Sequence, residues 1–210
     1  MVKFFQQTTT FNYSWDQVAQ GFWRRYPNPN SKHVLTEDTV ERRITPDGQL
    51  VTKRLLSKTN SIPKWAERFV QKALVNIIEE SIVDPKTKTL TTYTRNLGYT
   101  KVLSVTEKVV YKESSENPGK TMVLRTAVFD SQVSGFSRAI CAFGYERFKK
   151  NCSKMVSGFE YVLAGMFPNS APVITTTTVT AKLKDAAKNA SELAKAKAAA
   201  AKVPLYVKLH

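Results

Sequence analysis

The sequence predicts an α+β fold in which an antiparallel sheet of about seven strands receives one long C-terminal helix. The helix is predicted over 136–167, because an apolar period of 3.6 residues continues there for about 48 Å. The strands are predicted in pairs joined by short turns that contain Pro, Asp, Asn or Gly, so consecutive strands should run antiparallel. We expect a domain at 1–168, a linker at 169–180 and a separate Ala/Lys-rich tail at 181–210.

The elements before the long helix follow in chain order. A strand rich in Phe and Thr is predicted over 2–13, and Ser14 then begins a capping box for a short amphipathic helix that ends before Pro27. Each remaining strand is a β-rich run bounded by turn residues. These strands are predicted over 33–45, 49–59, 73–84, 87–99, 101–113 and 121–131.

The composition allows one core with a sizeable cavity. The 210 residues are 42% hydrophobic and 10% aromatic, which suits a core of about 165 residues with an appendage. The formal net charge is +15, and the part through Pro168 holds +10 of it, with 25 Lys and Arg against 15 Asp and Glu. A balance of this sign favours nucleic acid, anionic lipid headgroups or acidic partners without choosing among them.

Several function classes lack their signatures in this sequence. Cys141 and Cys152 lie about 16 Å apart along the predicted helix, too far for a disulfide between them, and no Cys/His metal pattern occurs. Without a nucleophile elbow, Walker A loop, GxGxxG, HExxH or paired carboxylates, we expect no enzyme, no metal and no cofactor. We find no apolar run long enough to span a membrane, no signal-peptide pattern and no element typical of a nucleic-acid-binding module.

Polar residues interrupt one edge of the long helix. Arg147, Asn151 and Lys154 share a stripe that Phe136 and Ile140 begin, so polar groups continue an otherwise core-facing edge. One interpretation is a buried anion held by these side chains. The alternative is the solvated edge of an amphipathic helix, and the helix pattern alone leaves both open.

The strand over 50–58 also mixes cations with leucines. Its alternation places Arg54, Leu56 and Lys58 on one face, which indicates either a cavity wall with a cationic point or a strand near an edge with snorkelling Lys and Arg. His33 lies near no second His, Cys or other partner that would make it a metal ligand or a base. With its ordinary pKa near 6.5, it would gain charge below about that pH.

Three segments carry a resemblance to a known family. They are 25–35 (RYPNPNSKHVL), 52–58 (TKRLLSK) and 62–65 (IPKW), and they closely resemble the PRELI/Ups family of mitochondrial lipid transfer proteins, most of all its PRELI branch. The resemblance covers about residues 1–167 with the order of elements intact. It implies a helix-grip fold, a curved seven-stranded antiparallel sheet around a long C-terminal helix and one phospholipid. Asn30 departs from the family pattern, which has an aromatic residue there.

The resemblance also implies a function, which is to carry phosphatidic acid between the mitochondrial outer and inner membranes for cardiolipin synthesis. The compartment is then the intermembrane space, and the partners are anionic mitochondrial membranes and a small helical-hairpin protein with twin Cys motifs. The alternatives are another anionic phospholipid such as phosphatidylserine, or a basic nucleic-acid-binding module. The implied headgroup contacts are Arg25, His33, Lys58, Asn151 and Lys154, with Arg54 and Arg147 as flanking positive charge.

These residue types suit a phosphate group, whose unpaired burial would cost several kcal/mol. Arginine offers a fork of donors, lysine a point charge and asparagine an amide. Segment 61–72 differs from a tight turn, and we interpret it as a lid that touches the membrane through Ile62, Trp65 and Phe69.

Overall fold

The computed structural model describes residues 2–59, 64, 67 and 74–170. The chain divides into two units, 1–171 and 172–210, and every described residue belongs to the first. Ile62, Trp65 and Phe69, on which the predicted lid depends, lie outside the described residues. The predicted tail also lies outside them, so its separation by a linker stays a prediction.

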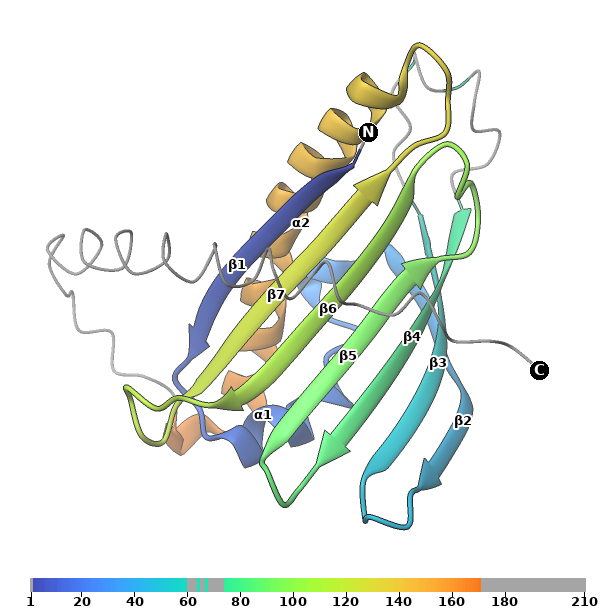
Figure 1. Ribbon diagram of the computed structural model, residues 1–210. Helices are drawn as coiled ribbons and strands as arrows, with labels where there is room; N and C mark the ends of the chain where they lie inside the picture. Colours follow the sequence, from blue (N-terminus) through green and yellow to red (C-terminus); the bar gives the residue numbers. More distant parts are fainter. Residues whose placement is uncertain (1, 60–63, 65–66, 68–73, 171–210) are drawn as a thin grey trace, which may run out of the picture. The chain divides into compact units, whose positions relative to one another are not determined.

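Within the described residues, seven strands form one antiparallel sheet in the order β1-β7-β6-β5-β4-β3-β2 (Figure 1). From β2 to β7 each strand pairs with the next one in the chain, as turn-connected hairpins should. The N-terminal strand instead closes the far edge beside β7. The strands are β1 (Lys3–Phe11), β2 (Val34–Ile44), β3 (Leu50–Thr59), β4 (Leu74–Asp84), β5 (Thr89–Asn96), β6 (Ser104–Glu113) and β7 (Thr121–Asp130).

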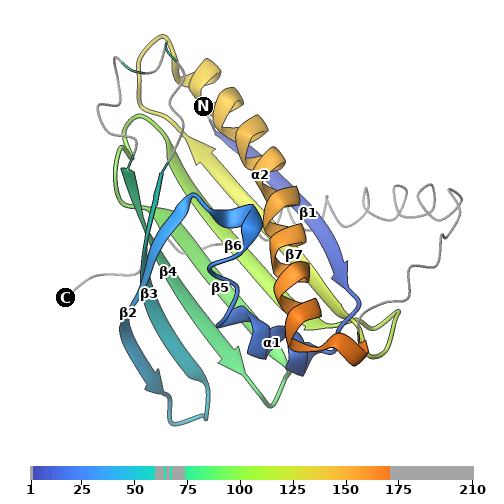
Figure 2. The same ribbon diagram turned by 180° about the vertical axis from the view of Figure 1, so that it is seen from behind.

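Two α-helices lie on the same face of this curved sheet (Figure 2). The short helix α1 (Trp15–Phe22) begins at the predicted capping box, in which the Gln17 amide donates to Ser14 Oγ and the Ser14 amide donates to Gln17 Oε1. The long helix α2 (Ser137–Met166) has 30 residues and matches the predicted helix to within one residue at each end. Single 3₁₀ turns, η1 (Pro29–Ser31) and η3 (Pro168–Ser170), complete the described elements.

The core fills the space between the helices and the concave face of the sheet. Phe159 and Leu163 of α2 are buried against α1 and against aromatic side chains of β1 and β6. The apolar residues of α2 are not all buried to the same degree, because Cys152 and Leu163 are buried whereas Met155 is only half-buried. The physical reason is that Met155 lines a cavity, so part of its side chain contacts no other side chain.

The loop after α1 packs closely on α2. Asn28 is buried there, with its Nδ2 donating to the Arg25 carbonyl at 2.6 Å and its Oδ1 accepting from the Asn30 amide at 3.0 Å. A Cβ added to Gly158 of α2 would lie 2.5 Å from the Asn28 Oδ1. The Tyr-Pro-Asn-Pro segment (26–29) therefore packs against α2 at a distance that only a glycine at position 158 allows.

We expect a Gly158→Ala substitution to lower the free energy of unfolding by about 1–3 kcal/mol, because the new methyl overlaps a hydrogen-bonded amide. Gly165→Ala is the matched control, since it lies in the same helix with no atom within 4 Å of its added Cβ. Helix propensity alone should stabilise that control by up to about 1 kcal/mol. Urea denaturation measures both, and equal stability of the two variants would refute the close packing.

Candidate functional site

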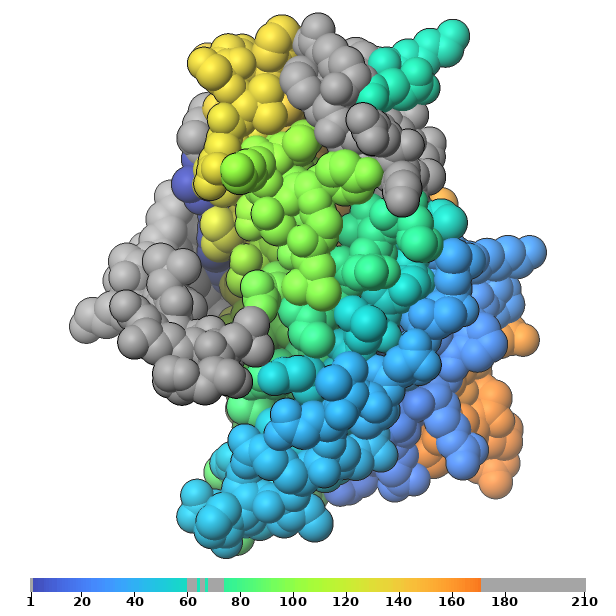
Figure 3. Space-filling model, turned by 90° about the vertical axis from the view of Figure 1, so that its right-hand side faces the viewer, coloured from blue at the N-terminus to red at the C-terminus, as the bar shows by residue number. Residues whose placement is uncertain are grey.

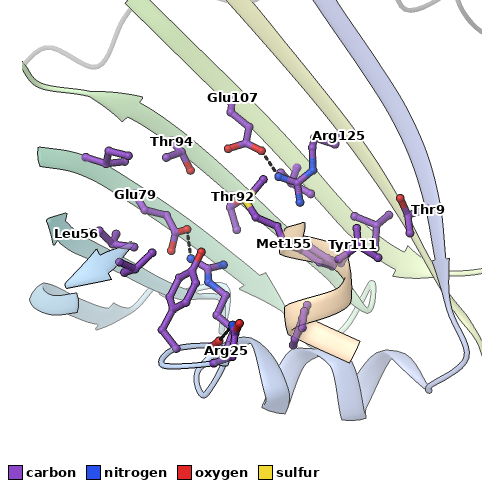
Figure 4. Close-up of a pocket in the computed structure, with 18 of the residues that line it drawn as sticks. Thr9, Arg25, Leu56, Glu79, Thr92, Thr94, Glu107, Tyr111, Arg125 and Met155 are labelled. Carbon is purple, nitrogen blue, oxygen red and sulfur yellow. Dashed lines mark hydrogen bonds and ion pairs between the residues drawn. The ribbon is translucent and has the colours of Figure 1, made fainter. Parts of the chain in front are cut away.

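A cavity of about 110 Å³ lies between α2, the loop after α1 and the concave face of the sheet (Figure 4). Its apolar lining includes Leu56, Val109 and Phe159, and Thr92 and Thr94 add hydroxyl groups from β5. This volume is well below the roughly 300–1,000 Å³ of small-molecule pockets. The part of the cavity lined by described residues is therefore smaller than a ligand with two acyl chains.

The mixed face of β3 is the concave, buried face. β3 lies between β2 and β4, so it is not an edge strand, and Leu56 and Lys58 line the cavity. Arg54, two residues earlier, is only 2% exposed and lies outside the cavity lining. Its Nη1 donates to Glu37 Oε1 at 2.6 Å and its Nε donates to Glu79 Oε1 at 3.1 Å. Arg54 was predicted to add positive charge beside a headgroup, but in the structure its charge is neutralised by these two carboxylates.

Arg25 reaches the cavity from the end of α1. Its guanidinium lies 4.2 Å above the Phe22 ring and forms an ion pair with Glu79. Burial by itself would lower the pKa of Arg25, but the negative charge of Glu79 outweighs burial, and the pKa is raised overall. Burial by itself would raise the pKa of Glu79, but the positive charges of Arg25 and Arg54 outweigh it, and the pKa is lowered overall. Both groups are thus charged. The buried Nε of Arg25 has no hydrogen-bond partner among the described residues.

A second ion pair faces the first across the cavity (Figure 4). Arg125 of β7 donates to Glu107 of β6, and both line the cavity. Burial acts to lower the pKa of Arg125, and Glu107 raises it overall. Sequence reasoning missed Glu79, Glu107 and Arg125. The available signal was a charged residue inside an alternating apolar face, as in the run Val75, Ile77, Glu79, Ser81 and Val83.

Basic side chains lie close together at one part of the site. Burial, followed by the charges of Lys58, Lys154 and Arg147, lowers the pKa of His33 below its usual range. Burial also lowers the pKa of Lys58, with Glu107 acting against this and Arg147 adding to it. Within the described part of the chain, the side chains of His33, Lys58 and Lys154 form no hydrogen bond or ion pair. Basic groups held together without a direct ion pair are what an anion-binding site requires.

The predicted site residues thus fall into two groups. Arg25, His33 and Lys58 line the cavity. Asn151 is half-buried and Lys154 is exposed, and both stay outside the cavity lining, on α2. From the sequence, His33 was expected to gain charge below about pH 6.5. Because its pKa is lowered in the structure, protonation should occur at a lower pH than that.

The described residues show neither a metal site nor a membrane-spanning helix. No three His, Cys, Asp or Glu side chains among them are arranged to hold an ion. None of the helices there is long and apolar enough to cross a bilayer. Cys141 and Cys152 are both buried thiols outside any disulfide, in agreement with the spacing argument.

Comparison with known proteins connects this geometry to a family. Residues 16–170 match the PRELI-like family. The chain belongs to the PRELI-like family. PRELI domain-containing protein 1, mitochondrial, of Mus musculus is 46% identical over 198 residues, covering 93% of this PRELI-like chain and 88% of the mouse protein. Protein UPS1, mitochondrial, of Saccharomyces cerevisiae is 34% identical over 171 residues, covering 78% of the chain and 94% of the yeast protein.

Solved structures of distant sequence share the fold of this PRELI-like chain. The protein TTHA0849 from Thermus thermophilus superposes with a TM-score of 0.54 at 12% identity, over 78% of this chain and 99% of that one. The Zhui aromatase/cyclase from a Streptomyces species superposes with a TM-score of 0.52 at 10% identity, over 79% of this chain and 93% of that one. At such identities the likeness shows the fold alone, and the helix-grip prediction is confirmed.

Proposed function

We propose that this protein is a phospholipid carrier that transfers phosphatidic acid between the mitochondrial outer and inner membranes and supports cardiolipin synthesis. The observation that carries the proposal is that Lys58, which has no hydrogen bond or ion pair among the described residues, and His33 line a cavity together with apolar side chains. Relatives named as mitochondrial support the organelle, and the intermembrane space is part of the proposal. No bond is made or broken in this role, so the protein acts without catalysis or cofactor.

The charges favour a phosphate monoester as the headgroup. Such a group carries about −1.5 to −2 at pH 7, and each cation about 4 Å away gains roughly 4 kcal/mol at the effective dielectric of a protein surface. Lys58 and His33 can meet the phosphate directly, and the free Nε of Arg25 adds a buried donor. A choline headgroup would bring its own cation to this cluster and be repelled.

The apolar part of the lining suits acyl chains. Leu56, Ile77, Val109 and Phe159 present carbon surface to the cavity. Each CH₂ group that leaves water contributes about 0.8 kcal/mol, so chains can hold a lipid that the headgroup contacts select. The part of the cavity lined by described residues is smaller than two acyl chains, and we propose that movement of the predicted lid at 61–72 admits them.

Glu107 is the observation that favours phosphatidylserine as the second candidate. It opposes the lowering of the Lys58 pKa by burial, and it lines the cavity, where it could accept an ammonium group. Transfer of labelled phosphatidic acid, phosphatidylserine and phosphatidylcholine between liposomes separates these cases. We expect phosphatidic acid to move fastest, whereas equal rates for phosphatidylcholine would overturn the proposal.

We further propose a small helical-hairpin protein with twin Cys motifs as the soluble partner. The family resemblance supports this, and it is tested by co-purification from the intermembrane space. Recovery of the chain without any such protein, under conditions that retain other complexes, would contradict it.

His33 should couple headgroup binding to proton uptake. In the free protein its pKa is lowered, so it is neutral at pH 7, and a bound phosphate would raise that pKa. Affinity for phosphatidic acid should therefore rise as the pH falls from about 7 toward 5. The phosphate itself titrates near pH 6, so the comparison is between wild type and His33→Gln. Calorimetry in buffers of different ionisation heat should show less proton uptake by the variant; equal uptake would exclude His33 from the site.

A further inference from the structure

We propose that the loop end of the sheet, formed by the β5–β6 loop (97–103) and the β7–α2 loop (131–136), docks directly on an anionic lipid bilayer. The inference rests on the proposed carrier function, because a lipid carrier has to meet a bilayer. It adds a surface made of described residues, separate from the predicted lid. It also states which end of the fold faces the membrane.

The two loops form one continuous surface. The Gln132 amide donates to the Lys101 carbonyl at 2.9 Å, which joins the loops directly. The register of the sheet brings the start of β1 to the same end, since Lys3 pairs with Phe129. Figure 1 shows both loops at the end where β1 and β4 begin, and Figure 3 shows their light-green and yellow atoms together at the top of that face.

Large apolar side chains are exposed at this end. Leu97 is 45% exposed in the first loop and Phe136 is 43% exposed in the second. Val2 and Leu74, beside the starts of β1 and β4, are 61% and 48% exposed. These side chains come from separate segments rather than from one flat patch. Such an arrangement suits insertion between lipid headgroups better than a fixed protein interface.

The charge of the loop end identifies the lipid class. Neither loop contains Asp or Glu, and Lys101 and Lys3 supply positive charge. The turns at the opposite end of the sheet differ, because they mix both signs: Asp47 and Glu116 lie there together with Lys86, Lys88 and Lys120. An anionic bilayer attracts basic residues within about a Debye length. The loop end thus presents basic residues without acidic neighbours inside the two loops, which suits contact with negative lipid.

Docking by this end brings part of the cavity lining toward the bilayer. β2 begins and β3 ends there, with the Thr59 amide donating to the His33 carbonyl at 2.9 Å. His33 and Lys58, which line the cavity, thus lie toward the docking surface. A headgroup leaving the membrane would meet these cations without crossing open water.

Vesicle binding by matched variants tests the proposal. The vesicles contain phosphatidylcholine and phosphatidylglycerol but no phosphatidic acid, so the proposed cargo is absent, and the substituted residues Leu97 and Phe136 lie outside the cavity lining. Each of Leu97→Ser and Phe136→Ser should weaken flotation with these vesicles about tenfold, the loss expected when part of a large apolar side chain no longer leaves water. Ile44→Ser is the control, because Ile44 is 74% exposed and lies at the opposite end of β2.

The outcomes separate this surface from the carrier function. Wild-type binding by Leu97→Ser and Phe136→Ser, or an equal loss in Ile44→Ser, overturns the docking surface even if the protein retains phosphatidic acid. If the variants instead abolish a dimer seen by analytical ultracentrifugation while vesicle binding persists, the loop end is a self-association surface and the proposal is wrong. Absence of phosphatidic acid from wild-type protein would refute the carrier function alone.

Discussion

Replacing Lys58 by glutamate should reduce transfer of phosphatidic acid between liposomes by at least about a hundredfold, or roughly 2.7 kcal/mol. The substitution removes one of the cations that line the cavity and puts a carboxylate beside the incoming phosphate. Lys154→Glu should have a smaller effect, about tenfold, because Lys154 is exposed and water screens its charge. A fluorescent-lipid transfer assay measures both, with the fold checked by circular dichroism.

The control for this prediction is Lys112→Glu. Lys112 is exposed on β6, so the substitution makes the same change in net charge away from the cavity. A general loss of attraction to anionic membranes would slow the control as much as Lys58→Glu. Full transfer by Lys58→Glu and Lys154→Glu would show that neither lysine binds the headgroup.

Arg54→Met should lower the free energy of unfolding by about 3–5 kcal/mol. Arg54 is buried between Glu37 and Glu79. Its removal leaves the partly buried Glu37 without its counter-ion and the buried Glu79 with Arg25 alone. Arg43→Met is the control, because Arg43 pairs with Glu41 at 3.1 Å on the exposed part of β2 and such pairs contribute at most about 1 kcal/mol. Chemical denaturation gives both values.

The acid dependence of stability provides a second readout of the same cluster. The pKa of Glu79 in the folded protein is lowered below its ordinary value of 4.5. Its contribution is therefore fully present above that pH and is lost as the pH falls through the lowered value. Loss of Arg54 should make this acid destabilisation shallower. An Arg54→Met protein that is as stable as wild type but fails to bind lipid would instead make Arg54 a ligand of the headgroup.

Local chemistry explains why the elements were predictable. The Ser14 capping box, the Pro-Asp-Gly turn between β2 and β3 and the long apolar period of α2 each depend on residues that are neighbours in sequence. The helix-grip layout then follows from hairpins that pair consecutive strands. The position of β1 beside β7 depends on long-range pairing, which no local pattern contains.

The site was predictable only in part. Family resemblance identified Arg25, His33 and Lys58, and the structure brings these three to one cavity wall. The partner of Arg54 could not be deduced from β3 alone, because it depends on the register that places Arg54 opposite Glu79. Buried ion pairs arise from two strands together, whereas alternation describes one strand at a time.

Mass spectrometry of the lipids retained by the purified protein tests the central claim most directly. The protein is produced in cells whose membranes contain abundant zwitterionic and anionic phospholipids, and is purified without detergent. The account predicts retained phosphatidic acid, enriched far above its share of the membrane, and its loss from a folded Lys58→Glu variant. Retention of phosphatidylcholine in proportion to its abundance, unchanged in Lys58→Glu, would contradict the assignment of the cavity to an anionic headgroup.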